Sequence, residues 1–259
     1  QTKAIRTTFG SRLFEDFVPK ENALVVQRLI DAGGITVGNT NVPEWGAGSQ
    51  TFNDVFGETK NPFDLTRTCG GSSGGAAVAL AARMLPLADG SDMGGSLRNP
   101  ASFCNVVGFR TSPGRVPVYP VRDGWSNLSV LGPMARTVAD CALMLAAITG
   151  PDDRNPISLP DSAELFLQTL ESNQKGTRVA FSPDFGGQLP VEPAVQHVIT
   201  QGMKVFSDLG CKVNESCPDF SGADEVFKTL RAWTFASQHG EGVRLHPEYY
   251  KETIIWNVE

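Results

Sequence analysis

Two serines stand in glycine-rich segments whose spacing points to shared chemistry. Ser72 lies in GGSSGG, and Ser96 lies 24 residues later in DMGGS. Glycines beside a hydroxyl admit backbone angles that other residues avoid and leave main-chain N–H groups open to a substrate. Converging N–H groups bind a phosphate or the oxyanion of a tetrahedral intermediate. Together the two segments indicate a nucleophilic or anion-binding site rather than a pair of turns.

The same residues also have structural interpretations. Ser is a preferred N-cap residue, so Ser72 or Ser73 could begin the helix that follows, and capping by Ser73 is compatible with catalysis by its neighbour. Asp92 and Arg98, on either side of Ser96, could form a structural ion pair. Such a pair would also brace the second serine segment.

Two other kinds of site fit part of the pattern. Residues 71–75 satisfy the G-x-S-x-G elbow of α/β-hydrolases. That elbow must follow a hydrophobic strand, and the preceding DLTRTCGG is not expected to form one. A phosphate-binding loop would need Gly-Lys-Ser or Gly-Lys-Thr after its glycines, and no such triplet follows here. We therefore set both interpretations aside.

The serine segments must be positioned by the elements around them. An alanine-rich helix over 75–83, buried nearly all round, and a core strand over 85–88 connect the two segments. Hydrophobic spacing, caps and glycine stops predict further helices at 23–32, 137–148, 194–209 and 224–238, and strands at 35–37, 106–109, 177–182 and 211–215. Residues 62–69 are expected to be irregular, and residues 177–215 a parallel strand–helix–strand unit.

This alternation predicts an α/β fold with a mixed, largely parallel central sheet and helices on both faces. The 259 residues, of which 41% are apolar and 19% charged, are typical of a globular protein, and we expect one domain over 1–259. A net charge of −6 argues against nucleic-acid binding, and no apolar stretch is long enough for a membrane span. The five cysteines are odd in number and lack metal-ligand spacing. Cys211 and Cys217 could pair, but we expect reduced thiols, a cytoplasmic protein and no metal or other cofactor.

Several motifs together resemble one known family, the amidase signature family of Ser–Ser–Lys amide hydrolases. They are GNTNVPEWG, NPFDLTRT, GGSSGG, GSDMGGSLRNPAS, VVGFRTSPGRVP and LGPMARTVAD, and they cover roughly the first 155 residues densely. The resemblance implies the amidase signature fold. It also implies a hydrolase that cleaves a carboxylic amide of a small molecule through an acyl-enzyme.

The resemblance assigns roles to individual residues. Ser96 matches the acyl-forming nucleophile, and Ser72 matches the bridging serine that follows a cis peptide bond. The main-chain N–H groups of the segment ending at the nucleophile match the oxyanion hole, and the other matching positions bind substrate or support these groups. The oxyanion positions are Met93, Gly94, Gly95 and Ser96, the substrate-facing loop is Gly46, Ala47 and Gly48, and the supporting residues are Asp92, Arg98 and Ser73.

The resemblance also implies a base outside these residues. The lysine of the family would precede Gln1 and the C-terminal portion would follow Glu259, so we expect 1–259 to be an inactive fragment. No histidine is needed, and His197, His239 and His246 are expected to be structural or solvent-facing. Trp125 is expected in the core, with a place in the acyl pocket as the alternative.

The family includes a second function, that of the glutamine-hydrolysing subunit of a tRNA-dependent amidotransferase. The serine- and aspartate-containing segment typical of that subunit, after the glycine-arginine turn, is replaced here by DGWSNLSVL. This difference favours a stand-alone amidase with a broader or hydrophobic substrate preference. The sequence leaves the oligomeric state open, a homodimer included.

Overall fold

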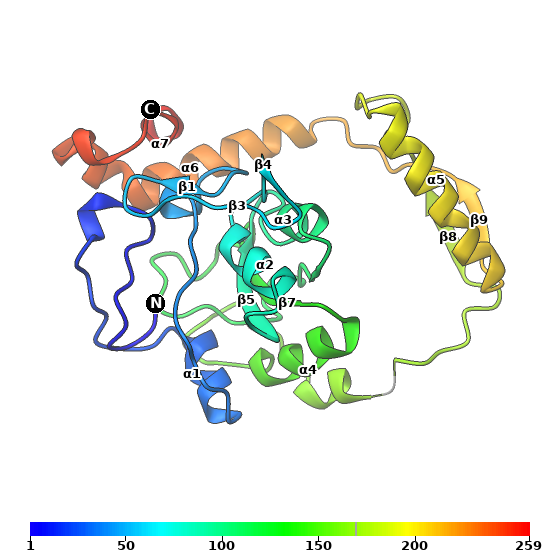
Figure 1. Ribbon diagram of the computed structural model, residues 1–259, viewed down its shortest axis with the longest axis horizontal. Coiled ribbons are helices and arrows are strands. Elements are labelled where there is room, and N and C mark those ends of the chain that lie inside the picture. The colour runs from blue at the N-terminus through cyan, green and yellow to red at the C-terminus, as the bar shows by residue number, and fades with distance from the viewer. Residues whose placement is uncertain (169) are drawn as a thin grey trace. The chain divides into compact units, whose positions relative to one another are not determined.

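The computed structural model describes residues 1–168 and 170–259 (Figure 1). The chain divides into two compact units. The first comprises Gln1–Gln168 with Thr229–Glu259, and the second comprises Thr169–Lys228. The serine segments and all the residues expected at the site lie in the first unit.

The first unit contains most of the helices and strands. Its helices are α1 (Leu24–Asp31), α2 (Gly74–Ala81), α3 (Arg98–Phe103), α4 (Val138–Ile148), α7 (Glu252–Val258) and, from Thr229 onward, α6 (Ala223–Leu245). Its strands are β1 (Phe52–Asn53), β2 (Gly57–Glu58), β3 (Lys60–Asn61), β4 (Asp64–Thr68), β5 (Leu87–Asp92), β6 (Val107–Gly108) and β7 (Val130–Ala135). The second unit contains β8 (Arg178–Phe181), α5 (Pro193–Asp208) and β9 (Lys212–Glu215), with β8 and β9 parallel.

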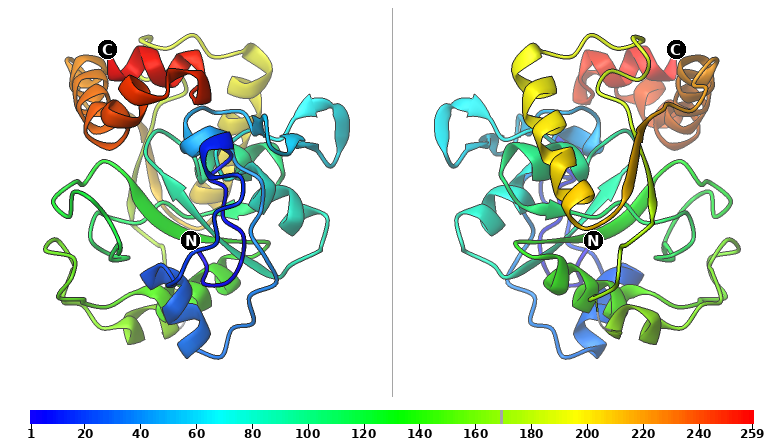
Figure 2. Two further views of the ribbon diagram at one scale, coloured as in Figure 1. Left: turned by 90° about the vertical axis from the view of Figure 1, so that its left-hand side faces the viewer. Right: turned by 90° about the vertical axis from the view of Figure 1, so that its right-hand side faces the viewer.

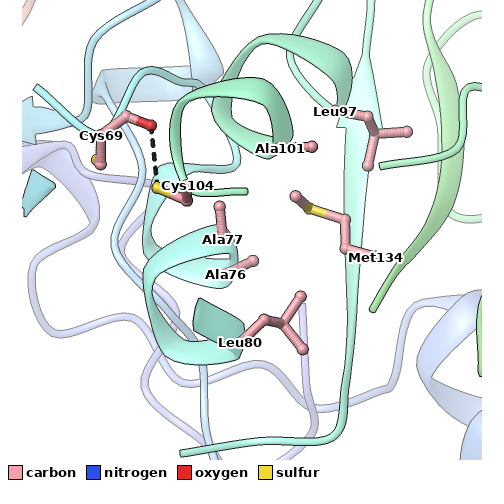
Figure 3. Close-up of a cluster of buried hydrophobic side chains, with 8 residues drawn as sticks. All are labelled: Cys69, Ala76, Ala77, Leu80, Leu97, Ala101, Cys104 and Met134. Atoms are coloured by element: carbon pink, nitrogen blue, oxygen red, sulfur yellow. Dashed lines mark hydrogen bonds between the residues drawn. The ribbon is translucent and has the colours of Figure 1, made fainter. Parts of the chain in front are cut away.

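The central sheet of the first unit has the strand order β5-β7-β6 and carries helices on both faces. On one face, Met134 of β7 packs with residues of α2 and α3 in the cluster drawn in Figure 3. Leu131, three residues earlier and so on the opposite face, packs against a cluster that includes Val25 of α1 and Leu145 of α4. Figures 1 and 2 show α1 beside α4, and Arg28 of α1 donates to the Ile148 carbonyl at 2.9 Å.

Helix α2 forms because its sequence, GGAAVALA, is small and apolar on every side. Alanine is the best helix former, and small side chains allow neighbouring backbone to approach closely. At Gly75, a Cβ would lie 2.5 Å from both the nitrogen and the oxygen of Asn41, whose carbonyl accepts a hydrogen bond from the Gly75 N–H at 3.1 Å. The first turn of α2 is thereby fixed against the loop that precedes residue 44.

The α/β class and the helices at 23–32, 75–83, 137–148 and 194–209 are confirmed within two residues at each end. Thr137 caps α4 as expected, with its Oγ1 accepting from the Asp140 N–H. The predicted parallel pairing is confirmed for β8 and β9. The last predicted helix, 224–238, continues to Leu245 as α6.

Several expectations need correction. In the described residues the central sheet is antiparallel rather than largely parallel, because β7 lies between β5 and β6 and runs antiparallel to both, so that the two strands of like direction are not neighbours. Residues 35–37 form no strand: Ile35 is 90% exposed and Val37 72% exposed, and no described strand pairs with them. Residues 62–69 are not irregular, since β4 pairs with β3 in a hairpin. The strand expected at 85–88 begins at Leu87 and continues to Asp92.

Candidate active site

A cavity of about 160 Å³ opens between the two serine segments, the loop after residue 44 and one face of α6. Its lining includes both expected catalytic serines, Ser72 and Ser96. The other lining residues are Trp45, Gly46, Ala47, Gly48, Ser49, Ser91, Met93, Gly94, Ser129, Arg231, Phe235, Gln238 and His239. A cavity of this size holds a molecule about as large as benzene, which fits a small substrate.

The two serine segments are hydrogen-bonded to each other. The Ser73 N–H donates to the Ser96 carbonyl at 3.1 Å, and the Gly71 N–H donates to Oδ1 of Asn99 at 3.0 Å. The peptide bond between Gly71 and Ser72 is cis, as the resemblance implies. These contacts bring the serines, 24 residues apart in the chain, to one cavity.

Ser73 stands at the N-cap position of α2, but its side chain forms no capping hydrogen bond. Its Oγ instead accepts from the Ser91 N–H at 3.3 Å and donates to the Ser91 carbonyl at 3.4 Å, which attaches α2 to β5. The side chain of Ser72 has no hydrogen-bond partner among the described residues. A helix cap therefore accounts for neither hydroxyl.

Asp92 at the end of β5 holds the segment that leads to Ser96. Its fully buried carboxylate accepts from the Gly95 N–H at 2.8 Å and the Leu97 N–H at 3.2 Å, and from Nε and Nη2 of Arg98, both at 3.0 Å. Gly95 has a φ of +116°, which glycine adopts without strain. Burial raises the pKa of Asp92, but these hydrogen bonds outweigh it and lower the pKa from 3.8 to about 2. The carboxylate is therefore ionised at neutral pH, and the N–H groups of Gly95 and Leu97 turn toward it on either side of Ser96.

Arg110 is a second cation on Asp92 that the sequence did not single out. Its Nη1 lies 2.9 Å from Oδ1 of Asp92 and also donates to the Asp92 carbonyl, while Nη2 donates to the Leu128 carbonyl at 3.2 Å. Leu128 precedes Ser129, which lines the cavity. Arg110 thus connects the buried carboxylate to a second wall of the cavity.

The loop that carries Gly46, Ala47 and Gly48 approaches Ser72 directly. A Cβ added at Gly46 would lie 3.6 Å from the Ser72 Oγ. Buried Glu44 anchors the loop: its carboxylate accepts from the Ser11 hydroxyl and from the Lys251 N–H, both at 3.0 Å. Nζ of Lys251 donates to the Ala47 carbonyl. Burial raises the pKa of Glu44 and lowers that of Lys251.

One face of α6 closes the remaining side of the cavity. Arg231, Phe235, Gln238 and His239 are spaced by about one helical turn, so they share a face. The His239 ring lies 5.1 Å from Trp45 and 5.7 Å from Phe235 between ring centroids. Burial, followed by repulsion from Arg122, lowers the pKa of His239 to about 4, so the imidazole is neutral at neutral pH.

The structure brings most of the expected site residues together. The cavity lining includes Gly46, Ala47, Gly48, Ser72, Met93, Gly94 and Ser96, whereas Ser73, Asp92, Gly95 and Arg98 are not part of it. Their catalytic roles stay predictions. Trp125 is 73% exposed and lies neither in the core nor on the cavity, so both interpretations of it were wrong. His239, expected to be structural or solvent-facing, lines the cavity instead. Arg231, Phe235 and Gln238 were missed because they belong to no motif.

Comparison with known proteins decides the family. The model of the Amidase family matches residues 1–254. The chain belongs to the amidase family. Among its relatives, a glutamyl-tRNA(Gln) amidotransferase subunit of Thermus thermophilus is 44% identical over 215 residues, and an acylamidase of Rhodococcus erythropolis is 40% identical over 235 residues. The alignments cover 83% and 90% of this amidase-family chain and 45% and 49% of those proteins.

Solved structures confirm the amidase signature fold. A 6-aminohexanoate cyclic dimer hydrolase complexed with substrate superposes with a TM-score of 0.90 at 26% identity, over 99% of this chain and 56% of that one. A bacterial aryl acylamidase of the amidase signature enzymes gives 0.87 at 27% identity, over 99% and 55%. The chain thus spans about half the length of its relatives. In the described residues, no helix is long and apolar enough to cross a membrane, and no group of three or more His, Cys, Asp or Glu residues could hold a metal ion.

Proposed function

We propose that the protein containing this chain hydrolyses a carboxylic amide to an acid and ammonia or an amine through an acyl-enzyme on Ser96. The observation that carries this proposal is the shared cavity of Ser72 and Ser96, with the Ser73 N–H bonded to the Ser96 carbonyl. Family membership and the acylamidase relative support the same chemistry.

The proposed reaction begins with attack of the Ser96 Oγ on the amide carbonyl. A serine hydroxyl is a weak nucleophile at neutral pH, so a base must take its proton. Ser72 passes that proton to a neutral lysine outside residues 1–259, and the reverse relay protonates the leaving nitrogen. Water then attacks the Ser96 ester and releases the acid.

The negative oxygen of the tetrahedral intermediate needs donors that are already in place. We propose the main-chain N–H groups of Met93, Gly94, Gly95 and Ser96 for this role. Asp92 supports the assignment because its hydrogen bonds fix the same segment and need no reorganisation when the charge develops. The Gly95 N–H already donates to Asp92. It therefore either donates to Asp92 and the oxyanion together, or leaves the oxyanion to the N–H groups of Met93, Gly94 and Ser96.

A second function within the family is glutamine hydrolysis by the amide-cleaving subunit of a tRNA-dependent amidotransferase. Its support is the 44% identity to the Thermus amidotransferase subunit, slightly above the 40% identity to the acylamidase. The DGWSNLSVL segment favours the stand-alone amidase instead. The amidase is our first proposal because Ser129, which belongs to that replaced segment, lines the cavity.

We propose a reducing compartment, the cytoplasm, because all five cysteines are free in the structure and three of them are buried. The substrate is a small molecule, given the volume of the cavity. A homodimer or a complex with other subunits remains part of the proposal, to be measured by the mass of the purified assembly.

The test is release of ammonia or amine from a panel of small amides by the full-length protein. Hydrolysis that depends on Ser96 is the expected result, with Ser96→Ala as the matched variant. L-glutamine joins the panel as the substrate of the second function. Undiminished amide hydrolysis by Ser96→Ala would refute the proposed nucleophile.

A further inference from the structure

Arg231 gives the cavity a single formal charge. Of the residues that line it, Arg231 alone carries a charged side chain at neutral pH, because His239 is neutral there. No Asp or Glu lines the cavity among the residues that the structure describes. Because no acidic side chain of the lining pairs with Arg231, its guanidinium can bind an anion that enters the cavity.

The guanidinium is held in place from one side only. Its Nε donates to Oδ1 of Asn257 at 2.8 Å, and Nδ2 of Asn257 donates to the Thr253 carbonyl at 2.6 Å, which fixes the amide orientation. The guanidinium carbon lies 4.8 Å from the centre of the Phe235 ring. Within residues 1–168 and 170–259, Nη1 and Nη2 have no hydrogen-bond partner, and no carboxylate pairs with Arg231. Both terminal nitrogens of the guanidinium, Nη1 and Nη2, are therefore free to donate to a ligand.

The surroundings of Arg231 are also positive. Burial lowers the pKa of Lys251, the charge of Glu44 opposes this, and repulsion from the nearby Arg231 adds to the lowering. Nη1 of Arg122 donates to the Gln238 carbonyl at 3.2 Å. The nearby acid, Glu44, is already bonded to Ser11 and to the Lys251 main chain, and it lies outside the cavity lining. Arg231 and Lys251 are both partly buried, and cations of this kind with no free acid beside them attract an anion strongly, because desolvation weakens screening.

We propose that Arg231 binds a carboxylate of the substrate, so that the site selects amides that carry a second, anionic carboxyl group. This inference rests on the proposed function, since it concerns the substrate of the same cavity. The planar fork of arginine matches a carboxylate with two parallel hydrogen bonds, a geometry that lysine does not reproduce. The proposal replaces the broader or hydrophobic preference expected from the sequence.

A purely structural role makes a different prediction. If Arg231 only packs on Phe235 and holds Asn257, its removal weakens every ligand equally or destabilises α6 and α7. If it binds a carboxylate, only charged ligands lose affinity. The comparison therefore needs charged and uncharged ligands of the same shape.

The experiment measures binding by calorimetry in full-length protein that carries Ser96→Ala, so that turnover does not interfere. Glutaramate is compared with its uncharged isostere 5-methylhexanamide, and N-butyrylglycine with N-isobutylbutanamide. The first pair places the carboxylate on the acyl side of the amide, and the second pair places it on the amine side. We expect at least one charged ligand to bind about 10- to 100-fold more tightly than its isostere, as for a charge-assisted hydrogen-bonded pair.

Adding Arg231→Met should remove that preference, and Arg231→Lys should restore only part of it. Arg122→Met is the matched control, because Arg122 is a nearby cation outside the cavity lining, and it should keep most of the preference. Equal affinities within both pairs, or a preference that survives Arg231→Met, would overturn the proposal. Failure of the proposed function has a separate signature: no amide turnover by the wild type, with the binding preference intact.

Discussion

The main-chain N–H of Ser73 donates to the carbonyl of Ser96 at 3.1 Å. This bond joins two segments that are 24 residues apart and directs Ser72 and Ser96 to the same cavity. Asp92 adds a second constraint, since its buried carboxylate accepts N–H groups on both sides of Ser96. The site is therefore built from backbone contacts, which a sequence motif can encode with glycines and one acid.

Ser72→Ala tests the proton relay. We expect kcat of the full-length protein to fall about 10²- to 10⁴-fold, because the relay acts in the transition state, while KM stays nearly unchanged. Thermal unfolding of the same sample should change little, since the Ser72 hydroxyl caps nothing among the described residues. A nearly wild-type kcat with a loss of about 1 kcal/mol of stability would instead identify Ser72 as a cap.

Asp92→Asn tests the support behind Ser96. The change leaves two arginines without their buried carboxylate, so we expect a loss of about 3 kcal/mol in the free energy of unfolding at pH 7. The folded pKa of Asp92, about 2, lies below its ordinary 3.8. Its contribution is thus complete above pH 3.8 and is lost as the pH falls toward 2, where the variant and the wild type should converge.

Denaturant unfolding at several pH values measures this difference, and Asp54→Asn is the control. Asp54 also pairs with an arginine, Arg12 at 3.5 Å, but its side chain is 75% exposed. An exposed pair contributes less than about 1 kcal/mol, so Asp54→Asn should be nearly neutral. Equal effects of the two substitutions would show that burial of Asp92 has no special role.

His239 predicts a loss of stability in mild acid. Its folded pKa of about 4 is below the ordinary 6.5, so the unfolded chain takes up the proton first. Stability from this group is complete above pH 6.5 and decreases as the pH falls to about 4. Titration of the imidazole carbon-bound protons by NMR should give a midpoint near 4 for His239. A midpoint near 6.5 would mean that solvent reaches the His239 ring and that its packing against Trp45 and Phe235 does not bury it.

Gly75→Ala tests the close contact between α2 and the loop before Glu44. The added methyl would meet Asn41 backbone atoms at 2.5 Å, which cannot move as a side chain end can. We expect a loss of about 1–3 kcal/mol in unfolding free energy. Gly240→Ala in α6 is the matched control, because its Cβ would meet only Val258 Cγ1 at 3.8 Å. That substitution should be neutral or stabilising by up to about 1 kcal/mol, since alanine favours helices.

The sequence predicted the elements that short-range chemistry determines. Alanine content defines α2, and a Thr137 cap with a glycine stop defines α4. The strand expected at 35–37 failed because apolar residues form a strand only where a partner strand exists, and no described strand pairs with Ile35 or Val37. The strand directions of the central sheet were wrong for a related reason: β7, which pairs antiparallel with both β5 and β6, was not predicted from the sequence as a strand.

In the candidate site as well, the sequence predicted the residues that lie in local motifs and missed those that long-range contacts bring to the cavity. Residues 44–48, 70–75 and 92–98 could be found because glycines, serines and charges cluster there in the sequence. Arg231 and His239 could not, since their helical spacing on α6 resembles any amphipathic surface until the helix is placed over the cavity. Arg110 was also missed, because its partner Asp92 lies 18 residues away. Long-range pairing carries no local signal.

The most direct test of the account is the position of a covalent label. A serine-directed fluorophosphonate should modify Ser96 in the full-length protein, identified by mass spectrometry of the labelled peptide, because Ser96 adjoins the proposed oxyanion donors. Ser96→Ala should abolish labelling, whereas Ser73→Ala should retain it. Labelling that survives Ser96→Ala and disappears in Ser73→Ala would contradict the account and identify Ser73, in its G-x-S-x-G context, as the nucleophile.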